Sequence, residues 1–522
     1  MALANRLWSD YSKLIYLLAT AAILLTVALG AAQLWGAEWR WAIITDRMLS
    51  SHDYLHPYRW ARAYYDKPLG SYWLVAIFAK LFGGLNEWVA RLPSVLAALG
   101  VIWCTYRLGT RLLSRSTGLL AGWILATSIM FVVWGRVAGA DMLNLAGTIA
   151  AVTWYFERKD QPGFVTYFVF FLILAVASWM KGLIAPAVAM LVLIPDLLRE
   201  QNWRRHLHMK LALAGVLGAA IYFVPFVLSL LVGGEDYDSN GLWLVFRENF
   251  VRYFNAFDHK DPVYLYLYAL PLYQFPWSIF LPFAIVGTVQ RWQTMTPASR
   301  WVVWSVLLVF VFLTASTSRR SYYILPILPF AALMVADWLM TVSSTYPRLL
   351  SVSAWVPVFA SLLLLLWFGV AVPYGNNIGG MRLFAEEIHA AAESIAPWSD
   401  WRMVLWSDTS RDAQYYIRAT NFPPYVVNTD ELRRLMAEDP HTIVLARVKD
   451  LDQLEYLLPQ AIIVRERFRA PARFFDEQKH HHLHVALILR PKDDAIAHRF
   501  TPASLPERNE LDQWSTRRRA LR

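Results

Sequence analysis

Acidic and basic side chains lie at the ends of long apolar segments in this sequence, where charge is costly for a membrane protein. The acids are Glu38, Asp66 and Asp141. The cations are Arg40, Lys67, Lys181, Arg252, Arg319 and Arg320, and the same segments contain His259 and Tyr323. Cations bind phosphate, whereas a carboxylate accepts a proton from an attacking hydroxyl or ligates a divalent ion. The mixture suits a negatively charged lipid phosphate and a polar group attached to it.

Most of these residues also have a purely structural interpretation. The acid–base pairs that follow the first apolar segment fit an exposed turn, or an interfacial cap with a snorkelling lysine. Asp141 fits the N-cap of a helix that begins at Met142, and Arg319 and Arg320 fit lipid headgroup contacts. Lys181 has the weakest structural explanation because it stands alone between two apolar runs. One such residue can be accidental, but the whole set on one side indicates a polar cavity.

The elements that must position these residues are apolar helices. The chain has 522 residues, of which 57% are hydrophobic, and its mean hydropathy is +0.35. A spanning helix needs roughly 20 apolar residues, and apolar runs recur over most of the first 375 residues. We therefore expect a polytopic α-helical membrane protein. About eleven spans are predicted, at 14–35, 87–108, 117–135, 141–156, 164–180, 182–198, 211–232, 263–288, 301–317, 322–341 and 351–373.

Composition narrows the function further. The first apolar segment has no small-residue cleavage site, so we expect a retained span rather than a removed signal peptide. The net charge of +10 is spread over many loops, which indicates membrane-surface contact and not a nucleic-acid patch. The single cysteine, Cys104, excludes an intrachain disulfide.

The apolar run from Ser71 to Phe82 is too short to cross a bilayer. We expect it to lie flat at the interface, within a large loop at 36–86, with Lys80 snorkelling. Omitting this run from the count of crossings places nearly all the unusual polar residues on one side. Lys and Arg are slightly more frequent in the short loops of the opposite side, which favours that opposite side as cytoplasmic.

The composition changes after Pro373. The pattern predicts a transmembrane domain at 1–374, a small α/β domain at 375–490, and a charged tail at 491–522. Predicted helices are 381–395, 411–418, 430–438 and 451–458, and predicted strands are 402–407, 424–428, 442–447, 461–467 and 483–489. His480, His481, His482 and His484 invite a metal-site interpretation. A solvated strand edge is favoured instead, because alternation puts only His482 and His484 on one face.

Read in order, seven motifs over residues 14–345 resemble glycosyltransferase family 39 of the GT-C class. This group contains protein O-mannosyltransferases and aminoarabinose-to-lipid-A transferases. The motifs are "GAEWRWAIITDRMLSSHDYLHP", "YYDKPLGSYWL", "VARLPSVLAALGV", "RVAGADML", "MKGLIAP", "FDHKDPVYLYLYALPLYQFPWSIFLP" and "SRRSYYILPILP". The C-terminal α/β domain resembles the periplasmic domain of the aminoarabinose transferases in placement and pattern, though not in motif.

The resemblance implies a role for each candidate. The lipid phosphate of a polyprenyl-phosphate sugar would be held by Lys67, Lys181, Arg40 and either Arg319 or Arg320. The other expected substrate-binding residues are Tyr323, Arg252 and His259. Asp66 and Asp141 would orient the sugar or acceptor, or hold a divalent cation, although no metal site is certain. Juxtamembrane helices of the first extracytoplasmic loop would present the acid–lysine pair to the active site.

One departure from the family pattern concerns the catalytic base. The first motif of the family usually reads Asp-Glu, with the Asp as the favoured base, whereas Ala37 precedes Glu38 here. Glu38 would then act as base, with Asp66 as a second catalytic candidate. Alternatively, the acceptor is itself ionised and needs no strong base, or the protein is an inactive or repurposed relative.

The expected protein is thus an inverting glycosyltransferase of the bacterial inner membrane, with its C-terminal domain in the periplasm. It would move one sugar from undecaprenyl phosphate to a lipid, glycan or protein. Two alternatives stay open: a transporter or flippase for lipid-phosphate sugars, and a non-catalytic binding relative. A transporter needs charges along its whole path, whereas here they gather near one side, which favours an enzyme. The sequence names neither sugar nor acceptor, nor the oligomeric state.

Overall fold

The computed structural model describes residues 2–59, 62–65, 67–232, 246–257, 259–407, 409, 414–419, 423–439, 441–467 and 483–489. Asp66, His480, His481, His482 and the tail 491–522 lie outside the described residues. The chain divides into two compact units. The larger comprises Met1–Gly30 and Leu34–Val370, and the smaller Ala31–Gln33 and Ala371–Arg522.

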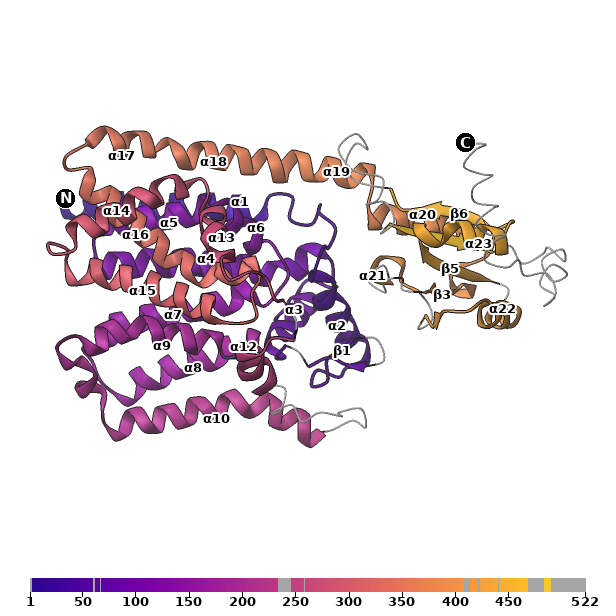
Figure 1. Cartoon of the computed structure of the whole chain (residues 1–522), viewed down its shortest axis with the longest axis horizontal. Coiled ribbons are helices and arrows are strands. Elements are labelled where there is room, and N and C mark those ends of the chain that lie inside the picture. Colours follow the sequence, from indigo (N-terminus) through magenta and orange to yellow (C-terminus); the bar gives the residue numbers. More distant parts are fainter. Residues whose placement is uncertain are drawn as a thin grey trace. The chain divides into compact units, whose positions relative to one another are not determined.

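The larger unit is a bundle of helices (Figure 1). Its first half contains α1 (Ala2–Thr26), α4 (Glu87–Leu112), α5 (Arg115–Thr127), α6 (Ile129–Gly135), α7 (Asp141–Arg158), α8 (Phe164–Lys181), α9 (Ile184–Leu198) and α10 (Met209–Val232). Its second half contains α13 (Leu265–Gln274), α14 (Leu281–Arg291), α15 (Pro297–Ala315), α16 (Leu328–Val342), α17 (Pro347–Ser353) and α18 (Trp355–Leu366). In the first half, α4 packs on α5 and α7, α7 on α8, and α8 on α10. Each predicted apolar segment therefore contains helix.

By length and composition, 6 helical runs among the described residues can cross a membrane, or up to 8 if each bent pair is one span. The first bent pair is α5 with α6, at 70°, and the second joins Leu265–Gln274 to Trp277–Arg291 at 117°. Pro276 lies in the second break and has no N–H to continue the helix. The first predicted span differs at its end, because α1 stops at Thr26. The count of eleven stays a prediction.

The first loop is built from two short helices, α2 (Glu38–Ser51) and α3 (Gly70–Leu81), with a two-stranded hairpin between them. The hairpin pairs β1 (Tyr58–Arg59) with β2 (Arg62–Ala63). α2 packs on α3 through a buried apolar cluster, and the indole Nε1 of Trp41 donates a 3.0 Å hydrogen bond to Ser71 Oγ. The run Ser71–Phe82 is thus almost entirely a short helix, as predicted.

The smaller unit is an α/β fold around a five-stranded sheet of order β4-β3-β5-β7-β6. The strands are β3 (Arg402–Trp406), β4 (Tyr425–Val426), β5 (Thr442–Arg447), β6 (Ile462–Arg465) and β7 (His484–Ile488). β3 is parallel to β4 and β5, whereas β7 is antiparallel to β5 and β6.

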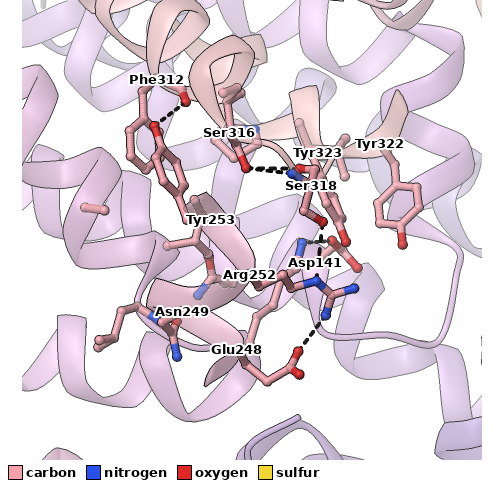
Figure 2. Close-up of a pocket in the computed structure, with 18 of the residues that line it drawn as sticks. Asp141, Glu248, Asn249, Arg252, Tyr253, Phe312, Ser316, Ser318, Tyr322 and Tyr323 are labelled. Carbon is pink, nitrogen blue, oxygen red and sulfur yellow. Dashed lines mark hydrogen bonds and ion pairs between the residues drawn. The ribbon is translucent and has the colours of Figure 1, made fainter. Parts of the chain in front are cut away.

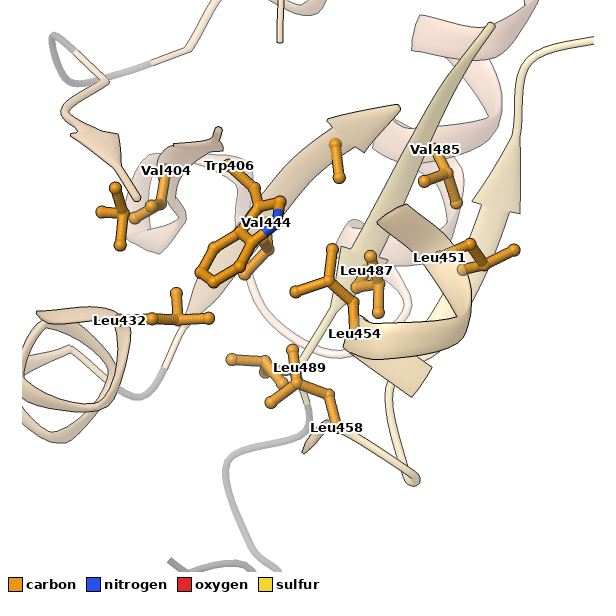
Figure 3. Close-up of a cluster of buried hydrophobic side chains, with 12 residues drawn as sticks. Val404, Trp406, Leu432, Val444, Leu451, Leu454, Leu458, Val485, Leu487 and Leu489 are labelled. Atoms are coloured by element: carbon orange, nitrogen blue, oxygen red, sulfur yellow. The ribbon is translucent and has the colours of Figure 1, made fainter. Parts of the chain in front are cut away.

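The described α-helices of the smaller unit are α19 (Val372–Ile378), α20 (Met381–Glu393), α21 (Gln414–Ile417), α22 (Thr429–Glu438) and α23 (Leu451–Leu457). Buried apolar side chains from β3, β5 and β7 pack against those of α22 and α23, including Trp406, Leu432 and Leu454 (Figure 3). Helical and strand-like patterns alternate along this region, and they are the basis of the predicted helices and strands. The helices and strands predicted in this region are confirmed within the described residues.

Candidate functional site

A pocket of about 350 Å³ opens in the larger unit where six stretches of chain meet. Its charged lining residues are Lys67, Asp141, Lys181, Glu248 and Arg252. Tyrosines, serines, two asparagines and apolar side chains complete it, and Figure 2 shows Ser318 facing Arg252. Charged groups on one wall and apolar groups on the other suit an amphiphilic ligand that carries an anionic headgroup.

The two lysines are brought close by a tight contact between α3 and α8. A Cβ atom at Gly70 would lie only 2.8 Å from the Cβ of Trp179 and 2.9 Å from its carbonyl oxygen. Glycine is needed for this approach because it has no side chain. Lys67 precedes α3, and Lys181 is the last residue of α8, so the contact positions both ammonium groups at the pocket.

Asp141 and Lys181 form an ion pair across the pocket. Asp141 is the first residue of α7, whose N-cap is Ala140, so its carboxylate does not serve the capping role considered from the sequence. The Lys181 ammonium also lies 4.5 Å from the ring centroid of Tyr323. The side chains of Asp141 and Lys181 are 17% and 18% exposed, so this pair borders the open pocket rather than the core.

Glu248 is the pocket residue that sequence analysis missed. It lies on the π-helical turn η2 (Arg247–Val251), which runs directly into α12 (Arg252–Phe254). One carboxylate oxygen lies 2.5 Å from Arg252 Nη1 and 3.8 Å from Lys67 Nζ. The other lies 3.0 Å from Arg247 Nη2. The acid-to-arginine spacing of four residues in "RENFVR" is the signal that could have revealed it.

The pocket is electropositive, and Lys67 shows this most clearly. Burial, followed by the charge of Arg252, lowers the pKa of Lys67 to about 8. Lys181 and Arg40 lower the pKa further, while Glu248 opposes the shift. Burial disfavours the charged lysine most, and the neighbouring cations add to this effect. An anionic ligand would offset the charge of these cations.

The other predicted cations, Arg319, Arg320 and Arg40, contact groups outside the pocket lining. Arg319 Nε donates a 2.8 Å hydrogen bond to the carbonyl of Asp261, and its backbone N–H donates to the carbonyl of His259. Arg320 Nε lies 2.8 Å from His259 Nδ1. These three predicted residues therefore contact one another but do not line the pocket. Arg40 stacks its guanidinium 4.8 Å from the ring centroid of Tyr64, also outside the lining.

Glu38 lies in the core, away from the pocket lining, and its side chain is 0% exposed. Arg91 grips it with two hydrogen bonds, from Nε at 2.8 Å and Nη2 at 2.7 Å. The backbone N–H groups of Trp35 and Ala138 donate two more, at 3.1 and 2.8 Å. Four hydrogen bonds thus occupy both oxygens of this carboxylate, and neither oxygen faces a site where the sugar acceptor could bind. The geometry therefore favours a structural role for Glu38 over the expected role as base. Ala37 beside it is exposed.

Among the described residues, no group of three or more His, Cys, Asp or Glu residues could hold a metal ion. The only carboxylates lining the described part of the pocket, Asp141 and Glu248, are each paired with cations. Asp66, which was predicted to bind a metal or to act in catalysis, lies outside the described ranges.

The family model described as "Dolichyl-phosphate-mannose-protein mannosyltransferase" matches residues 66–228. Among curated proteins, the chain is 27% identical over 393 residues to the undecaprenyl phosphate-alpha-4-amino-4-deoxy-L-arabinose arabinosyl transferase of Shewanella sediminis, covering 74% of this chain and 69% of that protein. The transferase of the same name from Aeromonas salmonicida is 25% identical, with 70% and 66% covered. The alignments thus span about two thirds of these relatives.

Solved structures give the fold. The crystal structure of ArnT from Cupriavidus metallidurans bound to undecaprenyl phosphate matches with a TM-score of 0.66 at 19% identity, over 91% of this chain and 97% of that one. Arabinofuranosyltransferase AftD from Mycobacteria matches with a TM-score of 0.54 at 14% identity, over 92% of this chain and 40% of that one. The comparisons confirm the resemblance indicated by the seven motifs: this chain is a multi-pass membrane protein with the GT-C fold, similar to glycosyltransferase family 39.

Proposed function

We propose that this protein is an inverting glycosyltransferase that uses a polyprenyl-phosphate sugar as donor. It transfers one sugar to a lipid, glycan or protein acceptor on the periplasmic face of the bacterial inner membrane. The observation that carries the proposal is the pocket, which places three cations and two carboxylates beside apolar walls. The similarity to aminoarabinose transferases that use undecaprenyl phosphate supports the same donor class.

The cations would hold the donor phosphate. Lys67, Lys181 and Arg252 present N–H groups to one space, where a phosphate oxygen can replace a carboxylate oxygen as the acceptor. The apolar lining residues are suited to the first units of the polyprenyl chain: Leu183, Ile184, Ala187, Phe250, Phe312 and Leu313. In this arrangement the phosphate lies beside Lys67, Lys181 and Arg252, and the polyprenyl chain lies along the apolar lining residues.

In the reaction, the acceptor oxygen bonds to the anomeric carbon from the side opposite the phosphate. The bond between that carbon and the phosphate oxygen breaks, and its electron pair leaves with the polyprenyl phosphate. The cations stabilise the charge that develops on this leaving group. Asp141 is the described pocket carboxylate best suited to orient the acceptor or take its proton, because the other one, Glu248, contacts three cations. Asp66 stays a second proposed candidate.

The test is sugar transfer by purified protein in detergent, supplied with labelled donors and with a panel of lipid, glycan and peptide acceptors. Wild type is compared with Lys181→Met, and Lys210→Met at the exposed start of α10 is the matched control. Wild type and control should release polyprenyl phosphate from one of a panel of labelled donors. Release by Lys181→Met should fall by about 10²–10³-fold, because a cation beside the leaving group is lost.

A second variant, Asp141→Asn, helps to distinguish an enzyme from a non-catalytic binding protein or a flippase. The enzyme proposal predicts bound donor with strongly reduced release, since the carboxamide cannot accept a proton. Wild-type protein that binds donors but cleaves none would overturn the proposal. A non-catalytic relative would then be indicated if it moves no lipid across a vesicle membrane, and a flippase if it does.

A further inference from the structure

Three cations converge on the single carboxylate of Glu248. Arg252 and Lys67 contact one oxygen, and Arg247 contacts the other, from two separate stretches of chain. Figure 2 shows the Glu248 carboxylate directed at the Arg252 guanidinium within the pocket. Arg252 and Lys67 are also the groups that face the space proposed for the donor phosphate. The Glu248 carboxylate therefore lies where a phosphate group that binds Arg252 and Lys67 would place its oxygens.

A carboxylate and a phosphate compete directly for such cations. Both offer anionic oxygens to the same guanidinium and ammonium N–H groups, and these donors have fixed directions. Glu248 lies 2.5 Å from Arg252 Nη1, so a phosphate oxygen can accept from this N–H only in place of the carboxylate oxygen. Glu248 must move aside for the ligand to use this N–H.

The local backbone suits such a movement. Glu248 lies on a single π-helical turn, a feature often found at functional sites, and none of the five residues of this turn is buried. A change of side-chain rotamer is enough to carry the carboxylate away from Arg252 while the turn stays anchored. The anchor is Asn249, whose Oδ1 accepts a 2.7 Å hydrogen bond from the backbone N–H of Leu183.

The competition acts differently on donor and product. A polyprenyl-phosphate sugar is a phosphodiester with one negative charge, whereas the released polyprenyl phosphate is a monoester with about −1.5 to −2 at neutral pH. The same cations therefore hold the product more tightly than the donor. Without an opposing anion, product release would become the slow step of turnover.

We propose that Glu248 is a positioning residue that competes with the lipid phosphate for Arg252, Arg247 and Lys67, so that its return to these cations expels the polyprenyl phosphate product. This inference rests on the proposed function and deepens it. Glu248 touches no reacting atom. It sets the affinity of the phosphate site through the cations that it contacts.

The experiment compares binding and turnover in wild type, Glu248→Gln and Glu248→Asp. The control is Glu157→Gln, which removes a carboxylate from an exposed pair with Arg107 at the other end of α7. Labelled undecaprenyl phosphate should bind Glu248→Gln at least about tenfold more tightly than wild type, because a competing charge is lost. Glu248→Asp keeps the charge and should stay closer to wild type.

Turnover supplies the second readout. Glu248→Gln should lower both kcat and the donor KM, and show a burst of one product per enzyme followed by slow release. Equal or weaker binding of undecaprenyl phosphate by Glu248→Gln would overturn the inference, as would the absence of binding to both proteins. Absence of cleavage by the wild type would overturn the proposed function alone, because the binding comparison still tests the competition.

Discussion

Two glutamate–arginine pairs in the larger unit share the same chemistry but lie in opposite surroundings. The Glu38–Arg91 pair is buried, with side chains 0% and 3% exposed, and two backbone N–H groups complete the carboxylate. Arg91 Nη1 also donates to the carbonyl of Leu29 at 2.7 Å. The Glu248–Arg252 pair borders a pocket, with 10% and 11% exposed.

The difference lies in what remains available to a ligand. In the first pair, both oxygens of the Glu38 carboxylate accept hydrogen bonds from Arg91 and from backbone N–H groups. In the second, several cations meet one acid beside an open cavity, so an incoming anion can exchange with the carboxylate. A charged pair is therefore better judged by its hydrogen-bond saturation and its access than by its residue types.

The largest expected effect comes from breaking the buried pair. Arg91→Met leaves the Glu38 carboxylate buried without its cation, which should cost about 3–5 kcal/mol of stability. The loss is measured as lower yield of folded protein and lower thermal stability in detergent. Arg107→Met, which breaks an exposed pair with Glu157, should cost about 0–1 kcal/mol. Equal stabilities of the two variants would contradict the structural role of Glu38.

Glu38→Gln sharpens the same contrast on the catalytic side. The saturated geometry predicts that the variant loses stability, while the folded fraction keeps a kcat within about threefold of wild type. Activity is measured per mole of folded protein that binds labelled donor. A kcat reduced by about 10²-fold or more in stable, donor-binding Glu38→Gln would restore Glu38 as the catalytic base.

The close approach at Gly70 links packing to the pocket. Gly70→Ala forces its Cβ against Trp179 and should cost about 1–3 kcal/mol, while also moving Lys67 relative to Lys181. Gly218→Ala is the matched control, because its Cβ would meet Phe171 Cβ at 2.5 Å and neither residue lines the pocket. Both variants should lose stability, but only Gly70→Ala should weaken donor binding. Equal donor affinities would show that the contact does not position the lysines.

The smallest effect concerns pH. The ordinary pKa of lysine is 10.5, and that of Lys67 is lowered to about 8 by burial and by Arg252. Its cationic form is therefore lost as pH rises through about 8, and affinity for a phosphodiester donor should fall by about tenfold between pH 7 and 9. Lys67→Arg keeps its charge and should flatten this dependence. An affinity of the wild type that stays constant to pH 9 would rule out Lys67 as a contact to the donor.

The sequence determined much of this architecture by itself. Long apolar runs predicted where the helices of the larger unit form. Short apolar runs rich in Val, Ile and Leu predicted the strands of the smaller unit, where β3, β5 and β7 are buried along nearly their whole length. Five predicted residues line one pocket, namely Lys67, Asp141, Lys181, Arg252 and Tyr323. Charge at the end of an apolar helix is costly unless it faces a polar cavity, so position along the chain was enough to find them.

Only the tertiary structure decided which charged groups contact each carboxylate. Glu38 and Arg91 are 53 positions apart, and nothing in their local spacing shows that they meet in the core. The spacing of Glu248 and Arg252 indicates a local ion pair, but only the fold shows that Lys67, from a distant loop, meets the same carboxylate. Sequence period defines the face on which a residue lies, whereas packing between helices defines which charges meet and how much room is left for a ligand.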